Sequence, residues 1–272
     1  MIVSGINIKN AILAELKLKI ANLYPKPRLG IIYVGDNPVI DRFVSLKEKS
    51  ALEIGVEILL KKFDASVSRD ELKKEIIDIL EHVDGLIIQL PLPAHIPRQE
   101  ILDLIPPGKD VDMLSSESRR LFFEHKLPIV PPVVGAILEV FERYAVILPG
   151  KKIAVVGSGH LVGEPFISWL TQHGIEPSIL NSKTPDFEDQ IREADIIVSG
   201  AGQPGLIQPY MLKPRAVVID AGTSESGGTL QGDANPECGT RAGLFTPVPG
   251  GIGPITVATL FKNLILLKEM KL

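Results

Sequence analysis

The feature that most constrains the fold is a repeated alternation of short β-branched runs with segments of helical periodicity. Runs such as RLGIIYVG (28–35) and DGLIIQL (84–90) are mainly apolar, which is typical of buried strands in a parallel sheet. The strands expected in the first half cover 28–35, 56–63 and 84–90, with helices at about 7–23, 38–54 and 69–82. This βαβ order predicts a parallel sheet with helical crossovers.

The same order begins again after a long irregular segment. Residues 91–132 are rich in Pro, Ser and charge, and such a segment beside a sheet is often functional. We expect a helix at about 133–145 and a domain boundary at LPGKK (148–152). Four further strands are expected at 151–157, 176–182, 194–200 and 216–222, with helices near 162–173 and 186–193, a Gly/Pro-rich loop at 246–254 and a final amphipathic helix. The fold class is therefore α/β with two domains.

Composition excludes several classes of protein. The net charge is −4 and no basic stripe is interleaved with aromatic residues, so nucleic acid is not an expected partner. Cys238 is the one cysteine, so no intrachain disulfide can form. No apolar stretch approaches the roughly 20 residues that span a bilayer, and the first residues do not resemble a signal peptide. We expect a cytoplasmic protein with no membrane or metal requirement.

A glycine-rich turn follows the first strand of the second half. In VVGSGHLVGEP, Gly157 and Gly159 would let the backbone approach a pyrophosphate, and Gly163 would permit close packing of helix on strand. The spacing GxGxxxG is one residue longer than the commonest form, and a structural turn without a ligand is the alternative. His160 lies in this turn and is expected to be exposed rather than catalytic.

The next strand ends in polar residues rather than in the acidic residue that favours NAD. Ser182 and Lys183 could contact a 2′-phosphate, which favours NADP, with NAD as the second choice. The alternative is that Lys183 is an ordinary solvated lysine.

The first half contains five side chains that could form a ligand site. Phe43 and Lys47 share one face of an expected helix, and Gln89 ends a strand at the edge where ligands bind in open α/β sheets. Asp110 and Asp112 lie in a loop, and a carboxylate can accept two hydrogen bonds from an aminopyrimidinone edge. The alternatives are a core Phe with a surface Lys, and solvated loop carboxylates.

Taken together, the motifs resemble those of a known family. VGDNP…FVSLKEK, GLIIQLPLPAHI, PPGKDVDM, GSGHLVGEP, GQPG, VIDAG and TPVPGGIGPIT follow one another in this order from about residue 28 to the C-terminus. This series resembles the bifunctional methylenetetrahydrofolate dehydrogenase/methenyltetrahydrofolate cyclohydrolase family. The resemblance implies NADP-linked oxidation of methylenetetrahydrofolate, followed by hydrolysis to 10-formyltetrahydrofolate, within one-carbon metabolism and purine biosynthesis.

The resemblance also implies an organisation and a set of site residues. A catalytic domain would cover 1–146 plus a last helix (256–272) that packs back on it, and a Rossmann-like domain would cover 147–255. The implied catalytic residues are Lys47, Gln89 and Asp112, and the implied substrate-binding residues are Phe43, Pro91, Gly251 and Pro254. The cofactor-binding residues would be Gly157, Ser158, Gly159, His160, Gly163, Ser182, Lys183, Gly200 and Gly222. The family resemblance further implies tetrahydrofolate derivatives as ligands, and a homodimer.

Four departures from the family pattern leave alternatives open. The chain has Phe43 where tyrosine is usual, Val133 and Val134 in place of a Thr-Pro pair, Ser158 in place of an arginine, and Met113 in place of a glycine. A cyclohydrolase with weak or lost dehydrogenase activity is therefore one alternative. A non-catalytic folate- or dinucleotide-binding protein is another.

Overall fold

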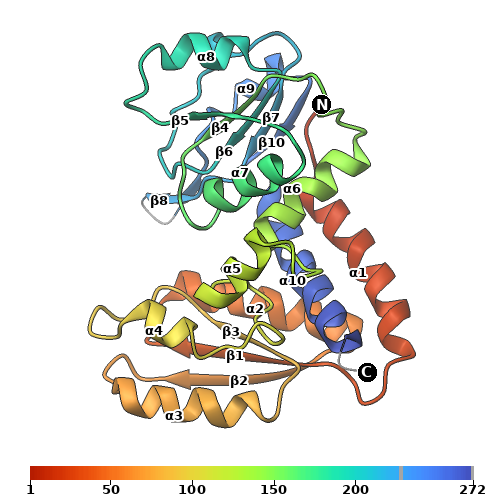
Figure 1. Cartoon of the computed structure of the whole chain (residues 1–272), viewed down its shortest axis with the longest axis vertical. Helices are drawn as coiled ribbons and strands as arrows, with labels where there is room; N and C mark the ends of the chain where they lie inside the picture. Colours follow the sequence, from red (N-terminus) through yellow and green to blue (C-terminus); the bar gives the residue numbers. More distant parts are fainter. Residues whose placement is uncertain (227–228, 271–272) are drawn as a thin grey trace. The chain divides into compact units, whose positions relative to one another are not determined.

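The computed structural model describes residues 1–226 and 229–270, and the chain divides into two compact units. The three-stranded unit, as we call it, consists of Asn10–Pro132 and the chain from Val257 onward. The five-stranded unit consists of Met1–Lys9 and Val133–Thr256. Each unit is built on its own parallel sheet, as the sequence predicts (Figure 1).

The three-stranded sheet has the order β2-β1-β3, with all neighbours parallel. Its strands are β1 (Arg28–Val34), β2 (Glu57–Phe63) and β3 (Gly85–Ile88), and its helices are α2 (Pro38–Ile54), α3 (Arg69–Leu80), α4 (Arg98–Leu102) and α5 (Ser116–Phe123). The Ser68 side chain accepts a hydrogen bond from the Glu71 amide and so caps α3. Ile76 and Ile79 of α3 are fully buried in one apolar cluster with Leu86 of β3.

Two long helices, α1 (Gly5–Ala21) and α10 (Ile252–Glu269), begin in the five-stranded unit and end in the three-stranded unit. The Asn263 side chain donates hydrogen bonds to the carbonyl oxygens of Val111 (3.0 Å) and Val130 (2.8 Å). Lys268 forms an ion pair of 3.0 Å with Asp84, in which both side chains are largely buried. These contacts show that the last helix packs against the rest of the three-stranded unit.

The five-stranded sheet has the order β10-β7-β6-β4-β5, again with all neighbours parallel. Its strands are β4 (Ile153–Val156), β5 (Ser178–Leu180), β6 (Ile196–Ser199), β7 (Val217–Asp220) and β10 (Leu244–Thr246). The other elements are α6 (Pro132–Arg143), α7 (Gly163–Gln172), α8 (Phe187–Glu193), a 3-10 turn (Pro209–Met211), α9 (Cys238–Arg241) and an antiparallel hairpin of β8 (Ser224–Ser226) with β9 (Thr229–Gln231). From β4 the chain crosses to β5 on one side, and it then passes to β6 on the other side of β4. The direction of the crossovers therefore reverses between β4 and β6, which is the topological switch point of the sheet.

The structure differs from the sequence expectation at the end of this unit. A fifth parallel strand, β10, precedes the loop expected at 246–254, and α10 begins inside that loop at Ile252. Pro254 is tolerated there because the first turn of a helix does not use its backbone N–H groups. The short strand had no visible alternation, and the prolines hid the start of the helix.

The compact units also differ from the predicted division at residue 146. Helix α6 belongs to the five-stranded unit, where the Phe141 ring lies 6.2 Å from that of Phe166 on α7. The first residues of the chain belong there as well, because the Val3 amide donates to the Phe245 carbonyl and the Gly5 amide to the Gly250 carbonyl. These side-chain and backbone contacts join segments that are separated in the sequence, and a local sequence pattern does not encode them.

Candidate active site

Lys47 and Gln89 meet at the carboxyl edge of the three-stranded sheet. Lys47 lies on α2, and its ammonium group donates a hydrogen bond of 2.8 Å to the Gln89 side-chain oxygen. Gln89 follows β3 directly, and its amide nitrogen donates to the Leu90 carbonyl at 3.2 Å. That second hydrogen bond fixes the orientation of the amide, so its oxygen faces the lysine.

Burial and mutual charge set the protonation of Lys47 and Asp112. Burial lowers the pKa of Lys47, and the nearby Asp112 carboxylate partly restores it. Burial raises the pKa of Asp112 to about 6, although the Lys47 charge lowers it and Asp110 raises it. The two groups therefore interact within one partly desolvated environment, where a proton can be gained or lost near neutral pH.

The two loop aspartates have different roles. Asp110 is 1% exposed and accepts hydrogen bonds from the backbone amides of Ser115 (2.9 Å) and Leu114 (3.4 Å). It therefore holds the loop, and the reading of Asp110 as a solvated carboxylate is wrong. Asp112 is only partly buried, so it is the carboxylate of the pair that can meet a ligand.

Met113, which stands where the family has glycine, keeps the backbone conformation that glycine favours. Its φ is 56°, in the left-handed region, and its side chain is 1% exposed. Burial of the methionine side chain contributes stabilisation that offsets the strain of this conformation.

Phe43 and Pro91 belong to the same unit. Phe43 lies one turn before Lys47 on α2 and is 37% exposed, so it is not a core residue. Pro91 is also exposed and follows Gln89 by two residues. The structure thus places an accessible ring on the same helical face as the lysine.

The glycine-rich turn joins β4 to α7, as predicted. Gly157 has a φ of +89°, and a Cβ at this position would lie 2.9 Å from the Ala201 Cα. A Cβ on Gly163 would overlap the Gly157 carbonyl, so this glycine permits the close approach of α7 to the turn. Nothing lies within 4 Å of the corresponding position on Gly159, which leaves that side of the turn open.

The polar residues expected to bind the cofactor are exposed around this turn. Ser158 and His160 are exposed, and the His160 ring is hydrogen-bonded to the Glu164 carboxylate one helical turn later. Ser182 and Lys183 are exposed at the end of β5.

The bend after β5 is built by its own side chains. The Asn181 side-chain oxygen accepts from the Lys183 amide (2.9 Å), and the Thr184 hydroxyl accepts from the Asn181 amide (2.8 Å). These hydrogen bonds shape the bend from which the lysine projects.

Gly200 and Gly222 have packing roles that the sequence did not reveal. A Cβ on Gly200 would overlap the Val162 side chain, and one on Gly222 would overlap the Asp233 carboxylate. Asp233 and its neighbour Asp220 are both buried, and the sequence analysis assigned them no role. The sequence signal that could have identified these two aspartates is their position at or after the end of a strand, within VIDAG and QGDAN.

Gly251 and Pro254 lie where the chain enters α10. The Gly251 amide donates to the Pro247 carbonyl at 2.7 Å, and a Cβ on Gly251 would lie 2.6 Å from the same oxygen. Gly250 has a φ of +102°, so this turn depends on two consecutive glycines. Gly251 and Pro254 belong to the five-stranded unit, whereas Phe43 and Pro91 belong to the three-stranded unit.

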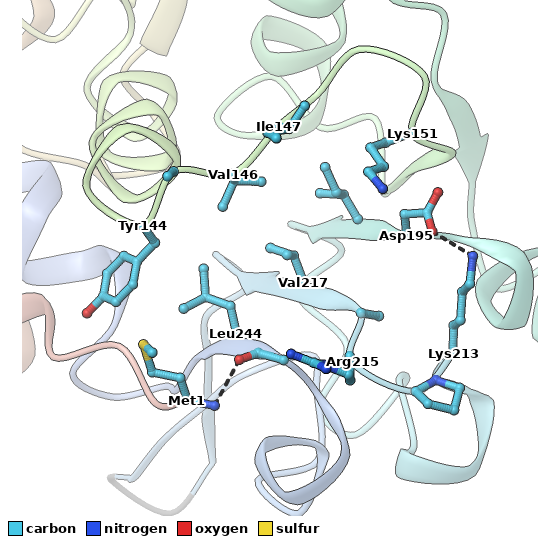
Figure 2. A pocket seen from close by; sticks show the side chains of 15 residues that line it. Met1, Tyr144, Val146, Ile147, Lys151, Asp195, Lys213, Arg215, Val217 and Leu244 are labelled. Carbon is cyan, nitrogen blue, oxygen red and sulfur yellow. Dashed lines mark hydrogen bonds and ion pairs between the residues drawn. The ribbon is translucent and has the colours of Figure 1, made fainter.

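A separate cavity of about 390 Å³ lies at the amino ends of the five-stranded sheet (Figure 2). Lys151, Asp195, Arg215 and Gly243 line it, and they precede β4, β6, β7 and β10 respectively. Ligands of open α/β sheets bind at the carboxyl ends of the strands, so this cavity is not the expected dinucleotide site.

Within 1–226 and 229–270, no group of three or more acidic, His or Cys side chains could hold a metal, and no helix is long and apolar enough to cross a membrane.

Fold and site together define a two-domain α/β protein with a glycine-rich dinucleotide-type turn and a separate lysine–glutamine–aspartate group. Residues 3–112 match the tetrahydrofolate dehydrogenase/cyclohydrolase catalytic domain, and residues 131–272 match the NAD(P)-binding domain of the same family. The chain belongs to the tetrahydrofolate dehydrogenase/cyclohydrolase family. The family inferred from the motifs is thereby confirmed.

Relatives match over nearly their whole length. The bifunctional protein FolD of Hydrogenobaculum sp. is 35% identical, with 96% of each chain covered. That of Mycoplasmopsis synoviae is 37% identical, with 97% of this chain and 98% of the relative covered. The crystal structure of Trypanosoma brucei methylenetetrahydrofolate dehydrogenase-cyclohydrolase, complexed with NADP and an inhibitor, is 33% identical with a TM-score of 0.92, covering 100% of this chain and 98% of that one.

Proposed function

We propose that the protein oxidises 5,10-methylenetetrahydrofolate with NADP and hydrolyses the resulting 5,10-methenyltetrahydrofolate to 10-formyltetrahydrofolate. The observation that carries this proposal is the hydrogen bond between Lys47 and Gln89 beside Asp112, in a chain that matches both domains of the family. A protein that only binds folate has no evident need of a desolvated lysine held by an amide.

For the hydrolysis, Lys47 is the group that moves protons. Its lowered pKa leaves more of the amine neutral near pH 7, and the neutral amine can accept a proton from the attacking water. The water oxygen bonds to the methenyl carbon, the bond from that carbon to N5 breaks, and N5 is protonated as the formyl carbonyl forms. The overall reaction consumes one water and releases one proton.

Gln89 and Asp112 position the reacting groups. Gln89 accepts the lysine hydrogen bond, which keeps the amine nitrogen in one place as its protonation changes. The Asp112 carboxylate has two oxygens, which match the two N–H donors of the pterin's aminopyrimidinone edge. The exposed ring of Phe43 supplies a surface for stacking the pterin, without the hydroxyl of the family's usual tyrosine.

For the oxidation, the residues around the glycine-rich turn fit a dinucleotide. The backbone at Gly157 and the open side of Gly159 leave room for a pyrophosphate at the start of α7. NADP supplies the hydride acceptor when it is bound. Ser182 and Lys183 would contact its 2′-phosphate, and the trypanosomal relative is a complex with NADP. NAD is the second choice, because Ser158 replaces the arginine usual in the family.

The direct test is to incubate the purified protein with methylenetetrahydrofolate and, separately, NADP or NAD. Reduced nicotinamide together with formyl product supports both activities, and the better cofactor decides between NADP and NAD. If no reduced cofactor forms, methenyltetrahydrofolate is supplied instead. Hydrolysis faster than the spontaneous rate then supports the cyclohydrolase-only alternative. The Val133 and Ser158 departures from the family pattern favour that alternative. No acceleration overturns the proposal.

The proposal also includes a homodimer and a cytoplasmic location, both taken from the family resemblance. Sedimentation of the purified protein tests the first, since a dimer has twice the mass of the 29.6 kDa chain. Fractionation of the source cells tests the second.

A further inference from the structure

Two buried carboxylates lie at the carboxyl ends of the strands of the five-stranded sheet. Asp220, the last residue of β7, is 0% exposed, and Asp233, which follows β9, is 1% exposed. Asp220 accepts hydrogen bonds from the amides of Gly222 (3.0 Å), Asp233 (3.2 Å) and Ala234 (2.9 Å). It therefore fixes the backbone on both sides of Asp233.

Asp233 in turn holds the loop that follows β6. Its carboxylate accepts hydrogen bonds from the Ser199 hydroxyl (2.6 Å), the Ala201 amide (2.7 Å) and the Gln203 amide (2.7 Å). Two of these donors belong to the loop backbone, so the carboxylate determines where the loop runs. The absent side chain of Gly222 provides the space that the carboxylate occupies.

This loop packs against the glycine-rich turn. A Cβ on Gly157 would lie 2.9 Å from the Ala201 Cα and 3.0 Å from the Gly200 carbonyl oxygen. A Cβ on Gly200 would overlap the Val162 side chain at the other end of the turn. A displacement of the loop would therefore change the surface that the turn presents to a dinucleotide.

The strand order indicates which half of the dinucleotide meets the loop. The pyrophosphate of a dinucleotide lies at the turn after β4, and its adenosine ribose is read at the end of the adjacent β5. The sheet order β10-β7-β6-β4-β5 places β6 and β7 on the other side of β4. The remaining, nicotinamide half of the molecule therefore extends over the ends of β6 and β7, where Asp233 holds the loop.

We propose that Asp233 is a positioning residue for the nicotinamide half of the cofactor, with Asp220 as its support. The carboxylate does not contact the cofactor, because its hydrogen bonds go to Ser199 and the loop amides. It instead fixes the backbone against which the nicotinamide rests. This inference rests on the proposed function, since it requires that the five-stranded unit bind NADP or NAD.

The test is Asp233→Asn, measured by calorimetric titration with NADP and with adenosine 2′,5′-bisphosphate, which contains only the adenine half. Asparagine keeps the volume but has one acceptor oxygen for three donors, so at least one loop amide loses its partner. We expect NADP affinity to fall about tenfold or more and adenosine bisphosphate affinity to stay unchanged, in line with the loss of one or more buried hydrogen bonds. If NAD is the better cofactor, NAD and adenosine monophosphate are the matched pair.

Asp195→Asn is the matched control. Asp195 directly precedes β6, whereas Ser199, which donates to Asp233, is the last residue of that strand. Asp195 lines the cavity of Figure 2 and forms an ion pair with Lys213. This variant should bind both probes as the wild type does. Ser199→Ala is the second variant if Asp233→Asn does not fold; it removes one donor and should weaken NADP binding by about threefold, again without effect on the adenine half.

The outcomes separate the two claims. Equal weakening of NADP and the adenine probe would mean that Asp233 only stabilises the unit, and it would overturn the inference. Unchanged NADP affinity in a folded variant would overturn it too. A wild-type protein that binds neither NADP nor NAD would overturn the proposed function and the inference together.

Discussion

Lys47 and Asp112 each have a pKa displaced toward neutrality, because burial disfavours the charged form of both groups. Their mutual attraction opposes that effect, so the protonation of one depends on the other. Their positions in the sequence made both residues candidates for a ligand site, and the family motifs supplied their expected catalytic roles. Lys47 and Gln89 are 42 positions apart, and no periodicity predicts that their side chains are hydrogen-bonded.

Asp112→Asn should shift the pH dependence of hydrolysis. The Asp112 charge raises the pKa of Lys47, so its removal lowers that pKa further. The rate rises with pH as the lysine loses its proton, and this acid limb should therefore move to lower pH in the variant. Hydrolysis of methenyltetrahydrofolate at saturating substrate, from pH 5 to 9, measures the shift. Asp78→Asn, at an exposed residue paired with Lys61, should leave the profile unchanged.

Asp220 predicts a pH dependence of stability. Burial raises its pKa from 3.8 to about 7 in the folded protein, so the folded state binds more protons than the unfolded state between these pH values. Stability should therefore fall as the pH rises from about 4 to 7, by at most about 4 kcal/mol from this group. Urea unfolding followed by the fluorescence of Trp169, the one tryptophan, measures this in the five-stranded unit. Asp220→Asn should reduce the slope; an equal slope in the variant would contradict the assignment.

At the scale of elements, the long periodic helices and the apolar strands were predictable, because their patterns extend over many residues. Helix α2 spans Pro38–Ile54, the same limits that the sequence predicts. Short elements were not predictable: β10 has three residues and the hairpin strands β8 and β9 have three each. Their position depends on pairing with distant backbone rather than on local pattern.

The turn between β4 and α7 allows the packing and ligand roles of its glycines to be separated. Gly163→Ala places a Cβ against the Gly157 carbonyl, so it should lower both stability and NADP affinity. Gly159→Ala meets no atom within 4 Å, so it should lower NADP affinity alone. Thermal unfolding and NADP titration of both variants are the measurements. Equal destabilisation by the two substitutions would show that the proposed division of roles is wrong.

The attachment of α10 predicts a further effect on stability. Asn263→Ala removes two hydrogen bonds and leaves the Val111 and Val130 carbonyls without the donors they have now. We expect a loss of roughly 2–4 kcal/mol in the free energy of unfolding. Val111 precedes Asp112, so folate binding should weaken as well. Denaturant unfolding measures the loss of stability. Lys262→Ala, one position earlier on the helix, is the comparison. An equal loss in the free energy of unfolding of that variant would contradict the role of the Asn263 side-chain amide.

At the scale of the whole molecule, the order of strands and helices predicted two α/β units, and the structure confirms a parallel sheet in each. The assignment of α6 and of the first nine residues to the five-stranded unit was not predictable. Both depend on contacts with segments far away in the sequence, such as Phe141 with Phe166 and Val3 with Phe245. Asp220 and Asp233 were missed for a related reason, because most of their hydrogen-bond donors lie on other strands and loops.

The most direct measurement of the central claim compares the wild type with Lys47→Ala in the hydrolysis of methenyltetrahydrofolate. The wild type should hydrolyse it faster than the spontaneous reaction. The variant should lose roughly 10²–10⁴-fold of that rate while still binding folate, because proton transfer contributes about this much. A folded variant that hydrolyses methenyltetrahydrofolate as fast as the wild type would contradict the role of Lys47 and the mechanism built on it.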